Sequence, residues 1–188
     1  MRALAAVPLV LALGLLPSAC VTEPVQPDLR LDAITTLGSL SDALEGVTRY
    51  ALHPDGRVVR ADAPNDPGEV RLAVESEIYN TLERAGFHLV PEAEAERYVA
   101  YAVGISGEMH DDELLELFGI TPGMDVDEDT LRGGVVLAII DPRAGSILWR
   151  GTVGAEVEER APTRAERDRR IRAVIAALLG ALPSRTGA

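Results

Sequence analysis

Apolar positions recur along this chain with two periods, one typical of strands and one typical of helices. The best-defined strand pattern is residues 135–151, VVLAIIDPRAGSILWRG, where two runs rich in Val, Ile and Leu flank a turn. Pro142 presets φ for a type I turn, and Gly145 can adopt the left-handed conformation that closes a hairpin. We therefore predict two antiparallel strands here.

Two earlier stretches also have strand character. Residues 47–52, VTRYAL, are rich in strand formers and end at the turn-forming residues 53–56, HPDG. Residues 98–105, YVAYAVGI, are apolar on both faces, which is typical of a central strand. One of these faces carries only small residues besides Tyr98, namely Ala100, Ala102 and Gly104.

Helical spacing appears in two segments. Asp66 and Glu69 can cap the first helix at its start, and Gly86 is a natural end. The second helix starts at a Thr163–Glu166 capping box. The two apolar stripes are Val70, Ala73, Val74, Ile78, Leu82 and Ala85, and Ile171, Val174, Ile175, Leu178, Leu179 and Leu182.

The predicted order is strand, helix, strand, strand, strand, helix. This order indicates an α+β fold, a two-layer sandwich with a mainly antiparallel sheet and two helices on one face. We divide the chain into a signal peptide (1–19), a tether with a weakly patterned segment (20–45), one α+β domain (46–183) and a tail (184–188).

The N-terminus reads MRALAAVPLVLALGLLPSAC. Arg2 and the apolar residues 3–16 are typical of a signal peptide, and the apolar run is too short to span a membrane. The small residues before Cys20 resemble a bacterial lipobox, although Pro17 stands where Leu is usual. An ordinary secreted protein with a stray cysteine is the alternative, but a sole cysteine at this position favours lipidation.

Lipidation would fix the location of the domain. Each buried CH₂ of an acyl chain such as palmitate contributes about 0.8 kcal/mol, so two or three chains anchor almost permanently. Val21 follows Cys20, whereas Asp usually marks retention in the inner membrane of Gram-negative bacteria. This resemblance implies the periplasmic face of the outer membrane. Residues 21–30 could extend about 30 Å at about 3 Å per residue.

Composition and charge narrow the classes of function. The 188 residues carry a formal charge of −12, which argues against a nucleic-acid partner. One cysteine excludes an internal disulfide and a site of several thiolates. The acidic run 125–129 begins like a calcium loop, but Thr130 and Val136 replace its required Gly and Glu, so we favour a solvated loop and no metal. His53, His88 and His110 lie in no catalytic motif, so we predict no enzyme activity and no cofactor.

The second hairpin strand contains two candidate contact residues. Trp149 could stack on a ligand, but its alternation with Ile147 and Val153 favours a core position. Arg150 points to the opposite face, where it can pair with an acid or meet a partner. Gly151 indicates a bulge or a close approach to the backbone. In the last helix, the arginines of 164–172 could bind an anionic headgroup or a polysaccharide. Glu166 with Arg170 and Asp168 with Arg172 are spaced i,i+4, which favours a self-paired solvated face.

Several short motifs resemble one bacterial lipoprotein family. They are Tyr50-Ala51-Leu52, Ala85-Gly86-Phe87, residues 95–101 (AERYVAY), Gly134-Val135-Val136-Leu137, Trp149-Arg150-Gly151 and Leu182-Pro183. The chain resembles, over about 46–183, the family catalogued as domain of unknown function 4136. The family usually has Asp where this chain has Glu96. The resemblance implies an envelope lipoprotein without established activity, and it supplies no catalytic residue.

The leading hypothesis is therefore a non-catalytic lipoprotein that is anchored through Cys20 and serves as an interaction or structural module. Its partners would be the membrane and an unknown envelope protein or lipid. We expect the partner surface at Ala100, Ala102, Gly104 and Arg150. The alternative is a carrier that binds a lipid or another hydrophobic ligand between sheet and helices.

Overall fold

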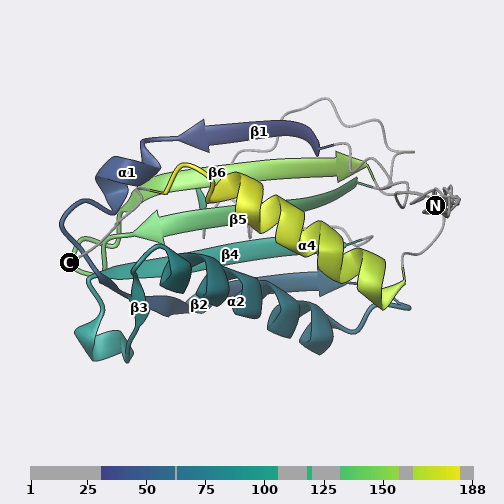
Figure 1. Ribbon diagram of the computed structural model, residues 1–188, viewed down its shortest axis with the longest axis horizontal. Helices are drawn as coiled ribbons and strands as arrows, with labels where there is room; N and C mark the ends of the chain where they lie inside the picture. Colours follow the sequence, from purple (N-terminus) through teal and green to yellow (C-terminus); the bar gives the residue numbers. More distant parts are fainter. Residues whose placement is uncertain (1–30, 62, 106–117, 120–131, 157–162, 183–188) are drawn as a thin grey trace, which may run out of the picture.

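The computed structural model describes residues 31–61, 63–105, 118–119, 132–156 and 163–182. These residues form a six-stranded sheet with two long helices, α2 (Pro67–Arg84) and α4 (Arg164–Leu178), on one face (Figure 1). A short helix, α1 (Leu40–Ala43), lies at one end. The predicted α+β class, with helices on one face of a mainly antiparallel sheet, is confirmed.

The sheet has the strand order β1-β6-β5-β4-β2-β3. Strand β2 runs parallel to β4 and β3, whereas the other neighbours are antiparallel. Helix α2 therefore forms the crossover between the parallel strands. The strands are β1 (Leu31–Leu37), β2 (Arg49–Ala61), β3 (His88–Leu89), β4 (Arg97–Ile105), β5 (Arg132–Ile140) and β6 (Ile147–Glu156), and a 3₁₀ turn (Glu92–Glu94) follows β3.

The predicted hairpin is the β5–β6 pair. Its turn is closed by a hydrogen bond from Gly145 N–H to Asp141 O at 2.8 Å, and Gly145 has φ 65°. The backbone N–H groups of Arg143 and Ala144 donate to the Asp141 carboxylate and hold its pKa below the usual value. Thus the acid at the first turn position stabilises the turn.

Both long helices begin at the predicted caps. The Asp66 side chain accepts a hydrogen bond from Glu69 N–H at 2.9 Å. At α4, Thr163 and Glu166 form the complete capping box. These caps satisfy backbone donors that would otherwise lack a partner at each helix start.

Strand β2 is longer than its pattern predicts. The sequence indicates a stop at residues 53–56, yet pairing with β4 resumes at Arg57. Leu52 pairs with Val99, and the next pair is Arg57 with Tyr101. Residues 53–56 of β2 therefore form a bulge opposite the single residue Ala100 of β4. The pairing of β2 is thus interrupted at the predicted turn residues, and it resumes after them because β4 continues alongside.

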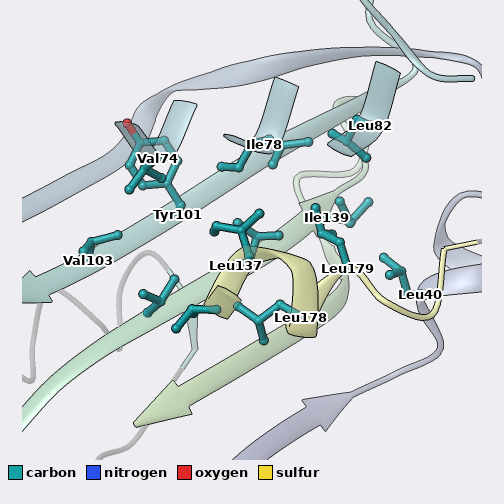
Figure 2. Packing of buried hydrophobic residues seen from close by; sticks show 14 of the residues in the cluster. Leu40, Val74, Ile78, Leu82, Tyr101, Val103, Leu137, Ile139, Leu178 and Leu179 are labelled. Atoms are coloured by element: carbon teal, nitrogen blue, oxygen red, sulfur yellow. The ribbon is translucent and has the colours of Figure 1, made fainter. Parts of the chain in front are cut away.

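The layer between sheet and helices is closely packed (Figure 2). Val74, Ile78 and Leu82 of α2 face the sheet, and Leu178 and Leu179 extend the contact from α4. Their partners on the sheet include Tyr101, Val103, Leu137 and Ile139, all at most 1% exposed. The hydroxyl of the buried Tyr101 donates to Glu75 at 2.7 Å, and burial is the main cause that raises its pKa.

Trp149 belongs to this core and is 2% exposed, as predicted from its alternation. Gly151 explains how the ring fits. A Cβ atom at Gly151 would lie 2.7 Å from the Trp149 ring and 2.8 Å from Leu178. The predicted close approach at this glycine is therefore present, and it involves side chains of the core.

Candidate functional site

Strand β1 ends the sheet on one side and carries two exposed apolar side chains. No described strand pairs with its outer edge, and residues 34–37 are all exposed. Ile34 is 47% and Leu37 is 58% exposed. We call residues 34–37 the β1 edge. These residues belong to the weakly patterned segment that follows the predicted tether, where no strand was expected.

The register places the two apolar side chains of the β1 edge on opposite faces. Ile34 lies opposite Val153, a core residue, so it belongs to the helix-covered face. Leu37 lies opposite Arg150 on the other face. An added strand would therefore cover apolar surface on both faces at once.

The other end of the sheet is different. Strand β3 has only two residues, and charged groups surround it. His88 lies 3.3 Å from Glu83, and Arg49 lies 3.2 Å from Glu96. A short, charged edge is a usual protection against unwanted strand pairing. The β1 edge carries no such charge.

The small-residue face of β4 was expected to meet a partner. Ala100 and Ala102 are 1% and 0% exposed, and Gly104 is also buried. Phe118, itself 0% exposed, belongs to the same buried cluster. These residues are buried by contacts within the chain, so they form no exposed surface on which a partner could dock. The remaining members of this second cluster are Val58, Val136, Ala138 and Ile140.

Arg150 also makes internal contacts. Its Nη1 atom donates to the backbone oxygens of Phe118 and Gly119 at 2.5 and 2.9 Å. The guanidinium thereby fixes Phe118 against the small-residue face. No acidic partner of Arg150 is found among the described residues, and the side chain is half-buried, so its expected contact with a partner stays a prediction. Carbonyl oxygens take the place of the acid.

A shallow hollow of about 280 Å³ lies beside the bulge of β2. His53 and Tyr98 meet there edge to face, with ring centroids 5.3 Å apart. His53 Nδ1 accepts hydrogen bonds from the backbone N–H groups of Asp55 and Gly56, so the ring stabilises the bulge. The lining also includes Ala100, Ile140, Asp141, Pro142, Gly145 and Ile147. His53 has a structural explanation here, and the hollow falls slightly below the usual volume of ligand pockets.

Glu96 has a clear structural role. Its carboxylate accepts hydrogen bonds from the backbone N–H groups of Thr48 and Arg49 at 2.9 and 3.0 Å. These bonds, with the Arg49 side chain, lower the pKa of Glu96 to about 2. The residue therefore ties the start of β2 to the start of β4. The sequence singled out this position only through the resemblance.

The arginines of α4 pair both with acids of their own helix and with α2. Arg167 is 5% exposed and pairs with Glu69 of α2 at 3.3 Å, while Arg164 reaches the same carboxylate at 3.1 Å. Arg164 also lies 4.0 Å from Asp168 on its own helix. These ion pairs join the starts of the two long helices.

Several predicted features lie outside the described residues, including Cys20, the acidic run 125–129 and His110. Within the described ranges, no group of three or more metal-ligating side chains is found. No helix in that part of the chain is long and apolar enough to cross a membrane.

No family model matches the chain, and no curated protein matches it. Among solved structures, a chain of the PelC dodecamer from Paraburkholderia phytofirmans is 16% identical with a TM-score of 0.49, and the match covers 82% of this chain and 99% of that one. A point variant of the same dodecamer is 16% identical with a TM-score of 0.50, covering 82% and 98%. The match with the TM-score of 0.50 shows that the two chains share a fold, and it shows nothing beyond the fold.

Proposed function

We propose that this protein is a lipoprotein of the bacterial envelope, held at the periplasmic face of the outer membrane through Cys20. Its α+β domain serves as a non-catalytic interaction module. The observation that carries the proposal is the β1 edge, an exposed stretch without charged side chains in the strand that starts eleven residues after Cys20. Exposed sheet edges bind extended segments by strand addition, in which backbone hydrogen bonds supply the affinity.

The fold comparison supports a role in assembly. The PelC variant that shares the fold is described as a dodecamer, so this architecture can be built into an assembly of many chains. A module that brings chains together needs an accessible surface and no catalytic groups. The β1 edge offers such a surface.

The carrier alternative finds no support in the described core. A hydrophobic ligand between sheet and helices would have to displace closely packed side chains such as Ile78 and Leu137, both 0% exposed. Interiors packed in this way contain few voids larger than a water molecule. Ligand binding between the layers would therefore require the helices to move away from the sheet.

The anchor can be tested by replacing the cysteine. The Cys20→Ala variant of the full chain is expected to leave the membrane fraction and to lose incorporation of labelled palmitate, because no other residue of the chain can carry the thioether-linked lipid. The matched control is Thr22→Ala, which leaves the cysteine intact and should stay on membranes. Sedimentation of membranes followed by immunoblotting measures the result. Continued membrane attachment of Cys20→Ala would refute the proposed anchor.

A further inference from the structure

The β1 edge lies in a neutral stretch of a strongly acidic protein. The chain has a formal charge of −12, so two copies repel each other over most approaches. Residues 33–41, AITTLGSLS, contain no charged side chain. Two copies can therefore approach each other along the β1 edge without bringing charged side chains of this stretch together.

We propose that the partner of the β1 edge is a second copy of this chain, bound β1 to β1 in antiparallel orientation about a two-fold axis. A segment that pairs with itself in this way forms an isologous contact, in which each copy uses the same patch. Backbone groups on the outer side of β1, where no described strand pairs, would gain partners, and two six-stranded sheets would become one. Ile34 and Leu37 of each copy would be covered by the partner's strand.

This inference rests on the proposed function, because the strand contact alone is small. Strand β1 has seven residues, and a contact of that size buries less area than stable complexes usually do. Anchoring through Cys20 would confine all copies to one membrane plane. Since only ten residues separate Cys20 from β1, every copy would present its edge at a similar height. The resulting effective concentration favours pairing without additional contacts.

Disulfide cross-linking in membranes tests the contact directly. Single cysteines are placed at Ile34, Thr35, Thr36 and Leu37 of the full-length lipoprotein, and the membranes are treated with a mild oxidant. Dimer is measured on non-reducing gels. Cys20 is the sole native cysteine, so the parent chain reports any background. The matched control is Leu72→Cys, since Leu72 is 69% exposed on α2, far from the proposed contact.

At least one β1 position is expected to give about tenfold more dimer than Leu72→Cys, because paired edges would hold two thiols within disulfide distance, whereas the control thiols meet only by chance collision. Adding Ile34→Asp to a responding cysteine at another β1 position should reduce this dimer to the control level, because like charges and a poor strand former then meet across the axis. Adding Leu72→Asp, with the same charge change, should leave it unaltered. Thr35→Lys is a second disrupting variant in case Ile34→Asp lowers the melting temperature.

The outcomes separate the inference from the proposed function. If the variants are membrane-bound but no β1 position exceeds Leu72→Cys, the self-pairing is refuted and the anchor stands. Dimer that persists in both disrupting variants also refutes the pairing. If the variants are found outside the membrane fraction, the anchor fails and the inference falls with it.

Discussion

At the residue scale, several charged side chains serve the fold at positions where the sequence allowed other roles. Glu96 joins two strands, Arg150 holds the backbone at Phe118, and Arg167 joins two helices. All three bind groups that are distant in sequence. Local spacing cannot reveal such partners, because it reports only neighbours on the same element.

The pKa of Glu96 gives a prediction about stability and pH. The pKa of Glu96 is about 2 in the folded chain, below its ordinary value of 4.5. The carboxylate therefore contributes its full stabilisation at pH values above 4.5, and this contribution is lost as the pH falls toward 2. We expect Glu96→Gln to lower the melting temperature at pH 7. The difference from wild type should shrink as the pH is lowered below about 5.

Thermal melts followed by circular dichroism between pH 7 and pH 2 measure this effect. The control is Glu94→Gln, which removes the same charge from an exposed side chain in the neighbouring 3₁₀ turn. That variant should melt close to wild type across the range. A Glu96→Gln melting difference that did not depend on pH would contradict the assigned role.

At the element scale, the strongly patterned elements could be predicted and the weakly patterned ones could not. The β5–β6 hairpin and both long helices carry complete local signals, namely a turn with Pro142 and Gly145 and two capped apolar stripes. Strand β1 lacks alternation because it is an edge with exposed side chains. The continuation of β2 after residues 53–56 depends on β4, which no local pattern records. For the same reason, the buried state of Ala100 and Ala102 depends on Phe118 from a distant segment.

Strand β6 offers a matched pair of glycines for testing how tightly the core packs. Gly151→Ala would place a Cβ atom 2.7 Å from the Trp149 ring, and we expect it to reduce the free energy of unfolding by about 1–3 kcal/mol through overpacking. Gly154→Ala adds the same atom where nothing lies within 4 Å and should change stability by less than about 0.5 kcal/mol. Urea unfolding measures both. Equal effects of the two substitutions would show that the ring does not need the space at Gly151.

At the scale of the whole molecule, the sheet is unevenly protected (Figure 1). Helices α2 and α4 cover one face, the cluster around Phe118 covers part of the other, and charged groups surround the β3 edge. The β1 edge remains exposed, and β1 is the first described strand after Cys20. The fold thus places an exposed, uncharged edge next to the segment that would attach the domain to the membrane. The fold class could be predicted from the order of elements, but this arrangement of protected and open edges required the sheet topology.

The central claim is that the mature chain starts at a lipid-modified Cys20. Intact mass spectrometry of wild-type protein extracted from membranes tests it most directly. The account predicts a chain that begins at Cys20 and whose mass exceeds that of residues 20–188 by two or three acyl chains with their glyceryl group. A mature chain with an unmodified thiol, or one cleaved at another residue, would contradict it.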